Sequence, residues 1–167
     1  MKLGAHISTS GGVDKTIDRA QELLFAPGIS IVKDAEIARH NAPIHSMHDP
    51  TEGGLATGLA EVAIRANVGL LIESSAIPVL PECREICDAL NLDPLGLVGS
   101  GALVATLSPE HSASVIKALE QEGITAHEIG HVTRPKDGLK LRTTHGICDL
   151  PHFERDELAR YFSESSI

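Results

Sequence analysis

Apolar residues recur at helical spacing most clearly over residues 53–66, where they share one face of a predicted helix: Leu55, Leu59, Val62, Ala63 and Ala66. The short run "PIHSMH" before it predicts a strand over residues 43–48. The remaining pattern predicts helices and strands in near alternation. The helices are expected over residues 13–24, 29–39, 80–90, 109–122 and 150–162, and the strands over residues 2–7, 68–74, 101–108, 126–133 and 139–144.

Strands that alternate with helices indicate an α/β fold. The two strands around the polar turn "RPKDG" are joined too closely for a helical crossover, so we expect a mixed sheet with helices and not a purely parallel one. Ser108, Pro109 and Gly123 mark the start and end of one helix. The terminal helix holds three of the four aromatic residues, so we expect it to dock on the body of the protein.

Length and charge limit the classes of function. The 167 residues suit one compact domain, and a formal charge of −9 argues against nucleic acid as a partner, because phosphate binding uses clustered Lys and Arg. No apolar run is long enough to span a bilayer, and the N-terminus lacks the layout of a secretion signal. Three irregularly spaced cysteines favour a reducing compartment. We therefore predict a cytoplasmic protein without a membrane or nucleic-acid partner.

The segment "SMHDPTEGGL" raises the main chemical question, because a glycine pair opens the predicted helix. Two glycines there forgo about 1–2 kcal/mol relative to alanine. Asp49 is one candidate N-cap, with Pro50 at the first helical position and Glu52 reaching back, and Thr51 is the other.

Two readings of this segment stay open. In one, the glycines form a tight strand-to-helix turn packed against the protein's own sheet. In the other, Gly53 and Gly54 bring amide hydrogens of the helix N-terminus to a phosphate or acyl-phosphate, with His48 and Asp49 beside it as ligand or proton-transfer groups.

Other candidate chemistry is weaker. The pairs His45 with His48 and His127 with His131 lack a companion Cys or carboxylate cluster, so we predict no zinc site. Cys83 and Cys87 fall on a helix face together with Ile86 and Leu90, which indicates core packing. Cys148 has no base nearby in sequence and is assigned no nucleophilic role. His145 is considered only as a residue that could lie near the site.

The stretches "MHDPTEGGLATGLAEVA", "AIPVLPECREICDALNLDPLGLVGSGALVATLSPE" and "IGHVT" resemble the C-terminal domain of the aminoimidazole ribonucleotide (AIR) synthase superfamily. The resemblance runs over about residues 25–162, and its hydrogenase-maturation branch is the most similar. It implies an ATP-using enzyme that activates its substrate through a phosphorylated intermediate. It also implies that a separate N-terminal domain supplies most of the ligands for ATP and Mg²⁺.

By this resemblance, Gly53 and Gly54 match the family's glycine turn, Thr51 lies within the same element, and His48 and Asp49 match its polar pair. The sequence differs from the family pattern in two respects. No nucleotide-binding domain precedes the match, and the tail "YFSESSI" lacks the C-terminal cysteine that the carbamoyl dehydratase of the family uses as substrate carrier. We therefore expect the isolated chain to be inactive.

Residues 1–23 resemble instead the first strand and helix of endonuclease IV. We expect residues 1–24 to form a short accessory segment, derived from a fusion, and residues 25–167 to form the AIR synthase-related domain. Nuclease activity is not expected, because no metal cluster accompanies the segment.

Two functions remain open. The chain either completes an ATP-using site with a nucleotide-binding domain or partner protein, or it binds a small anion or a partner without catalysis, with a homodimer as one expected assembly.

Overall fold

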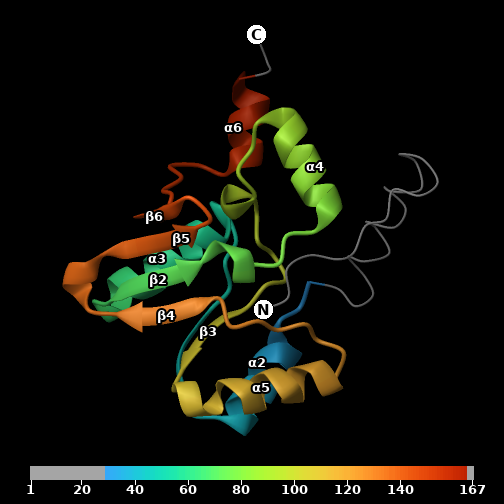
Figure 1. Ribbon diagram of the computed structural model, residues 1–167. Helices are drawn as coiled ribbons and strands as arrows, with labels where there is room; N and C mark the ends of the chain where they lie inside the picture. Colours follow the sequence, from blue (N-terminus) through green and yellow to red (C-terminus); the bar gives the residue numbers. More distant parts are fainter. Residues whose placement is uncertain (1–28, 165–167) are drawn as a thin grey trace.

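The computed structural model describes residues 29–164 (Figure 1). The helices predicted near residues 29–39, 53–66, 80–90 and 109–122 are all present, with ends within three residues of those expected. The strand and helix predicted within residues 2–24 lie outside the described residues. The described α-helices are α2 (Val32–Asn41), α3 (Gly54–Ala66), α4 (Pro81–Leu90), α5 (Pro109–Gln121) and α6 (Glu157–Glu164).

The described strands form two sheets. A two-stranded antiparallel sheet pairs β1 with β3, and a four-stranded sheet has the order β4-β2-β5-β6. Within it, β2 runs parallel to β5 and antiparallel to β4, so the predicted α/β fold with a mixed sheet is confirmed. The strand bounds are β1 (Ile44–His48), β2 (Gly69–Glu73), β3 (Val104–Leu107), β4 (Gly130–Thr133), β5 (Leu139–Thr143) and β6 (Gly146–Asp149).

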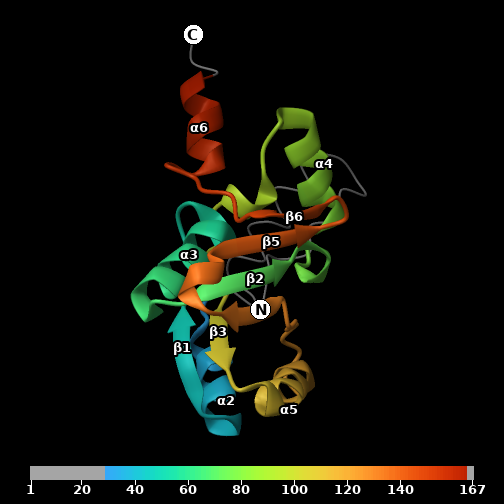
Figure 2. The same ribbon diagram turned by 60° about the vertical axis from the view of Figure 1, so that its left-hand side comes forward.

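The short turn between β4 and β5 does not make them neighbours, because β2 lies between them (Figure 2). The turn, which contains the 3₁₀ helix Pro135–Asp137, passes the start of β2, where the amide of Leu70 donates to the carbonyl of Gly138 at 3.0 Å. A side chain on Gly69 would collide with Arg134 and Gly138, so glycine permits this close crossing. The mixed sheet thus arises through pairing of both strands with β2.

Two parts of the chain's end differ from the prediction. Strand β6 was not expected, because its residues are all exposed and show no alternation of apolar and polar positions. The terminal helix was predicted from residue 150, which is wrong, since α6 begins only at Glu157. Asp156 precedes it and accepts a hydrogen bond from the amide of Leu158 at 2.9 Å, which marks the start of the helix.

Two clusters of buried side chains hold the described residues together. The first joins α3 to β2 and β5, with Leu55, Leu59, Ile72 and Leu141 among its members. The second joins α2 to α5 and includes Ala38, Val115 and Leu119. We call the elements α2, β1, β3 and α5 the two-stranded part, and β2, β4, β5 and β6 with α3 the four-stranded part (Figure 2). In residues 29–164, no helix has both the length and the apolar composition to cross a bilayer.

Helix α6 is docked, as expected, but through polar contacts more than through its aromatic residues. Glu157 is buried, accepts from the amide of Asp93 at 2.9 Å, and pairs with Arg160 at 2.7 Å. Arg160 also donates to the carbonyl of Asn91 at 2.9 Å. Of the aromatics, Phe153 packs against the first core cluster, whereas Phe162 is exposed.

Candidate functional site

His48 ends strand β1 and points toward helix α3. Its Nε2 lies 2.6 Å from Oε2 of Glu61, one of the residues of α3. Gly58 allows this approach, because a Cβ there would lie 3.2 Å from the His48 ring and 2.7 Å from Cβ of Pro50. Both side chains of the pair are partly exposed, so the pair contributes at most about 1 kcal/mol to stability. Its effect is to fix the orientation of the imidazole.

The segment that follows His48 does not cap α3 as predicted. The helix begins at Gly54, and its N-cap is Gly53 with a φ of 74°, in the left-handed region. The predicted caps Asp49 and Thr51 are therefore both wrong, and Pro50 is fully buried ahead of the helix instead of forming its first turn. A buried proline and an exposed Asp49 turn the chain before the helix starts, so residues 49–52, between β1 and the N-cap Gly53, form a loop.

Contacts within the chain account for both glycines of the turn. Gly53 and Gly54 have positive φ values of 74° and 67°, which glycine adopts at little cost. A Cβ on Gly54 would meet the carbonyl oxygens of Leu95, within the 3₁₀ helix Pro94–Gly96, and of Leu97, directly after it. A Cβ on Gly53 would meet the side chain of Thr57. The packing reading of the glycine pair is thus sufficient to explain why these positions are glycine.

Hydrogen bonds tie the same turn to the neighbouring loop. The carbonyl of Thr51 accepts from the amides of Gly54 and Gly99, each at 3.1 Å. The amide of Gly54 is therefore already used inside the protein. One polar group remains beside the turn: the hydroxyl of Thr57 is buried and has no hydrogen-bond partner among the described residues. The structure thus brings His48, Glu61 and Thr57 to the predicted segment, with Asp49 exposed at its edge.

Glu61 and Thr57 were not identified from the sequence. Both lie on α3 at positions that the helical pattern assigns no special role, and the contact of Glu61 with His48 joins residues thirteen apart along the chain. A periodicity of apolar residues gives no signal for such a pair, because it depends on the angle at which β1 meets α3.

The cysteines on α4 are only partly as predicted. Cys87 is buried, and its burial together with the adjacent Cys83 raises the pKa of its thiol to about 12. The two sulfur atoms lie 4.0 Å apart. Ile86 does not share the buried face, because its side chain is 55% exposed. Within residues 29–164, no group of three or more His, Cys, Asp or Glu side chains is placed to hold a metal ion.

Comparison with known proteins identifies the family. The family described as "AIR synthase related protein, C-terminal domain" matches residues 3–142. The match begins inside the segment for which an endonuclease IV-like start was predicted, and that resemblance has no support from the comparisons.

Individual relatives agree with the family match. The chain is 42% identical over 98 residues to the carbamoyl dehydratase HypE of Rhizobium leguminosarum bv. viciae, which covers 58% of this chain and 28% of the relative. With the HypE of Cupriavidus necator it is 33% identical over 132 residues, covering 76% of this chain and 33% of the relative. The chain thus spans about a third of the length of these relatives.

Solved structures show the same fold. The crystal structure of Escherichia coli HypE superposes with a TM-score of 0.68 at 31% identity, covering 78% of this chain and 42% of that one. A HypE structure in complex with ATP superposes with a TM-score of 0.62 at 32% identity, covering 68% and 37%. With its mixed α/β fold and its glycine turn, this chain belongs to the AIR synthase related protein family, as its C-terminal domain.

Proposed function

We propose that this chain acts as the C-terminal domain of a HypE-like, ATP-dependent hydrogenase-maturation enzyme and is inactive by itself. The proposal rests on the family match over residues 3–142, together with relatives named carbamoyl dehydratase of which the match covers only about a third. In this proposal a nucleotide-binding domain holds most of the ATP and Mg²⁺ contacts. This chain completes the site in the cytoplasm when it binds that domain or a partner protein.

In this proposal His48 and Asp49 position or protonate the activated substrate. The hydrogen bond that His48 donates to Glu61 supports this role for His48, because a fixed imidazole is better placed for proton transfer than a rotating one. Access of a substrate to His48 needs no rearrangement of the fold, since its side chain is 31% exposed.

Thr51, Gly53 and Gly54 form the proposed phosphate contact at the start of α3. The helix N-terminus favours an anion, and the buried Thr57 hydroxyl adds a polar group without a partner in the described residues beside Gly53. Because the amide of Gly54 already donates to Thr51, a phosphate would displace that bond or bind through the neighbouring amides. We therefore expect weak binding by this chain alone.

The first experiment measures ADP formation by the chain alone and in a mixture with the N-terminal two thirds of the Rhizobium leguminosarum relative. We expect no turnover by the chain alone and turnover in the mixture. His48→Ala and Asp49→Ala should lower the rate in the mixture by about a hundredfold, the usual effect of losing a proton-transfer group. Asp88→Ala, an exposed acidic residue on α4, is the matched control and should leave the rate unchanged. Turnover by the chain alone that Asp49→Ala abolishes would contradict the proposal.

The phosphate contact is tested separately, by titrating the chain with inorganic phosphate and following its backbone amides by NMR. We expect saturable shifts at Gly53, Gly54 and Leu55 in the millimolar range. An absence of such shifts up to 100-fold excess over millimolar protein would remove the phosphate contact while leaving the assignment to the family intact.

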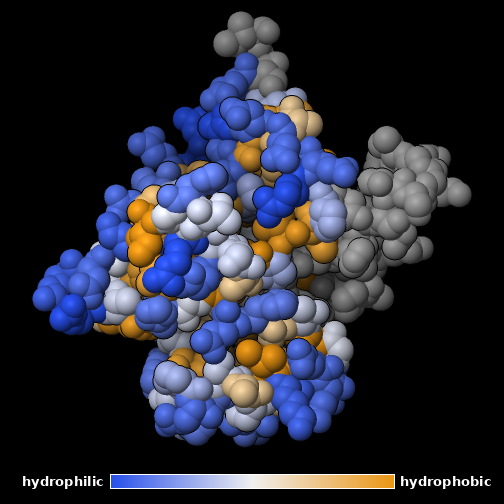
Figure 3. Space-filling model, viewed as in Figure 1, coloured by the Kyte–Doolittle hydropathy of each residue, from blue (hydrophilic) through white to orange (hydrophobic). Residues whose placement is uncertain are grey.

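A second function, partner binding or self-association without catalysis, is supported by apolar side chains at the surface. Figure 3 shows apolar patches between hydrophilic residues on one face of the molecule. The exposed apolar residues of the described chain include Ile64, which is 74% exposed, together with Ile86 and Ile147. Sedimentation of the chain over a hundredfold range of concentration tests this. A homodimer is expected to dissociate on dilution, and a single monomeric species throughout contradicts self-association.

A further inference from the structure

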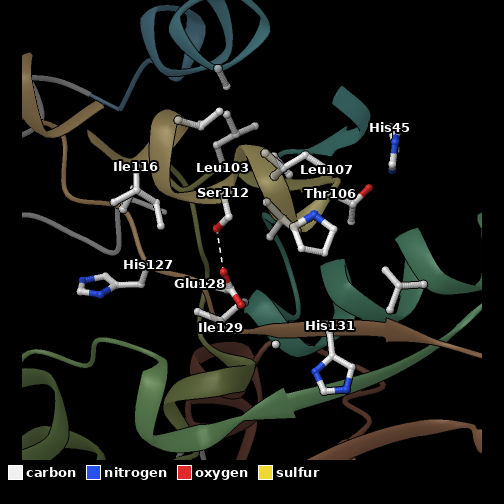
Figure 4. A pocket seen from close by; sticks show the side chains of 18 of the residues that line it. His45, Leu103, Thr106, Leu107, Ser112, Ile116, His127, Glu128, Ile129 and His131 are labelled. Atoms are coloured by element: carbon white, nitrogen blue, oxygen red, sulfur yellow. Dashed lines mark hydrogen bonds between the residues drawn. The ribbon is translucent and has the colours of Figure 1, made fainter. Parts of the chain in front are cut away.

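A cavity of about 440 Å³ lies between the two-stranded part and the four-stranded part, away from the glycine turn (Figure 4). Its walls come from α5 and β3 on one side and from β4 on the other, and Ala38, Leu59 and Leu70 also line it. His48, Asp49, Thr51, Gly53 and Gly54 are not among its lining residues. The volume falls within the range of small-molecule sites, about 300–1,000 Å³.

The lining of the cavity is mostly apolar, and its charged groups are of one sign. Leu, Ile, Val and Ala side chains form most of the wall, and among the residues that the structure describes no Lys or Arg contributes to it. Its two acidic residues are Asp34 and Glu128. Figure 4 shows Glu128 accepting a hydrogen bond from Ser112 across the cavity, at 2.7 Å between the oxygen atoms. A lining with this charge is unsuited to phosphate or another anion.

Asp34 is the group in the cavity whose hydrogen bonding is incomplete. Its side chain is 4% exposed, and its Oδ1 has no hydrogen-bond partner among the described residues. The neighbouring Lys33 does not donate to it, because the Lys33 ammonium pairs at 2.8 Å with Glu122, the residue after the C-terminal end of α5. Asp34 lies in the first turn of α2, where the helix dipole offsets only part of the unfavourable burial of a carboxylate.

A buried carboxylate oxygen that has no donor within residues 29–164, on a residue that lines an apolar cavity, is complementary to a particular ligand. Such a ligand must carry a positively charged group or a strong N–H donor that reaches Asp34. The rest of the ligand must be apolar, because it fills the space between α5 and β4. Imidazoles of His45, His127 and His131 lie at the mouth of the cavity and are themselves exposed. They leave room for a polar substituent there.

We propose that this cavity binds a small organic cation, an amine on an apolar body, with its ammonium group donating to the carboxylate of Asp34. The site is independent of the glycine turn and of the proposed ATP-dependent reaction, and it adds a second ligand class to the domain. Binding supplies to Asp34 Oδ1 a hydrogen bond that no residue of the described chain provides.

The test uses the full 167-residue chain and three probes with a similar apolar body: 2-phenylethylamine, the uncharged 2-phenylethanol and the anionic 3-phenylpropanoate. Binding is followed through the backbone amides of cavity residues by NMR, including Asp34, Val115 and His131. We expect the amine to bind about tenfold more tightly than the alcohol, the advantage of one charge-assisted hydrogen bond. The propanoate should not saturate.

The variant Asp34→Asn keeps the size of the side chain and removes its charge. It should lower the affinity for the amine to that for the alcohol and leave the affinity for the alcohol unchanged. Two matched controls, Glu128→Gln at the cavity wall and Asp49→Ala at the glycine turn, should each retain most of the amine preference.

Three results overturn the proposal: equal affinity of the unaltered chain for amine and alcohol, amine-induced shifts outside the cavity, or an undiminished amine preference in Asp34→Asn. The ranking of the three probes on the unaltered chain decides the question even if Asp34→Asn does not fold.

Discussion

Glu157 in α6 and Asp34 in α2 are both buried carboxylates, yet they differ in hydrogen bonding and in packing. Glu157, at 6% exposure, accepts from Arg160 at 2.7 and 2.9 Å and from the amide of Asp93 at 2.9 Å. Asp34 is buried to the same extent and has an oxygen without any partner in the described chain. The first carboxylate docks helix α6 on the loop before the 3₁₀ helix Pro94–Gly96, and the second faces a cavity.

The packing also differs: it is close around Glu157 and leaves open space beside Asp34. Near Glu157, the loop of residues 94–97 is pressed so closely against the start of α3 that Gly54 has no space for a methyl group. Near Asp34, the space between α5 and β4 is left open. Close packing around a carboxylate whose two oxygens both accept hydrogen bonds, as at Glu157, indicates a structural role, whereas an open space beside a carboxylate oxygen without a partner among the described residues indicates a ligand.

The largest effect is expected from Gly54→Ala, which tests whether the region near Glu157 is completely filled. The new Cβ would meet two backbone carbonyls in addition to adopting a φ of 67°, so we expect a loss of about 3 kcal/mol in the free energy of unfolding, measured by urea denaturation. The matched control is Gly123→Ala, which has a φ of 73° and open space around its Cβ. It should lose only about 1 kcal/mol, the backbone cost alone. Equal losses in the two variants would show that packing does not determine the glycine at position 54.

A smaller loss is expected from Arg160→Ala, which tests the partners of Glu157. Removing Arg160 leaves a buried carboxylate with one remaining donor, and because the Arg160 side chain is itself partly exposed we expect a loss of about 2 kcal/mol. Arg142→Ala breaks an exposed pair with Glu73 at 2.6 Å and should lose less than about 1 kcal/mol. If both variants lose the same free energy in urea denaturation, Glu157 does not depend on Arg160.

Asp34→Ala is expected to raise the free energy of unfolding, whereas Gly54→Ala and Arg160→Ala lower it. The change removes a carboxylate oxygen that is buried without a donor, so the free energy of unfolding of the ligand-free chain should rise by about 1 kcal/mol. Asp88→Ala on the exposed face of α4 is the control and should change stability by less than about 0.5 kcal/mol. A clear loss of stability in Asp34→Ala would mean that this carboxylate is structural after all.

The smallest effect concerns the acid side of the stability profile. Hydrogen bonds from Arg160 lower the pKa of Glu157 below its ordinary value of 4.5. The folded pKa is thus below the unfolded one, so the contribution of Glu157 is present above pH 4.5 and is lost as the pH falls through the folded pKa. Urea denaturation between pH 7 and about pH 3 should show a steeper acid loss for the unaltered chain than for Glu157→Gln. Parallel profiles would place the acid sensitivity in other carboxylates.

Local sequence signals predicted the helices well. Helix α3 was expected from residue 53 to residue 66 and runs from Gly54 to Ala66, because its apolar residues repeat without interruption on one face. Helix α5 begins at Pro109 as expected, although Ser108 makes no side-chain capping bond. Strand β6 was missed, because a strand exposed on both faces shows no alternation of apolar and polar residues. The start of α6 was placed too early, because the polar residues before Glu157 resemble the first turn of a helix.

The candidate site was predictable only in part. His48 and Asp49 are adjacent in sequence to the glycine pair, so their proximity to the turn required no knowledge of the fold. The contact of His48 with Glu61 did require it. The caps of α3 were mispredicted, since a positive φ at Gly53 allows the helix to start later than Asp49 or Thr51 would permit.

The sequence by itself determined which segments become helices, that the fold is α/β with a mixed sheet, and that a glycine turn follows His48 and Asp49. The helices and the glycine turn depend on residues within one or two turns of each other, so local periodicity and backbone preference suffice for them. The mixed sheet was inferred from the short turn between β4 and β5, although both strands pair with the distant β2. Asp34 is one of 23 acidic residues in the chain, and nothing local separates it from the rest. Its burial and its unmade hydrogen bond arise only when α2, α5 and β4 come together, because desolvation is a property of the packed whole.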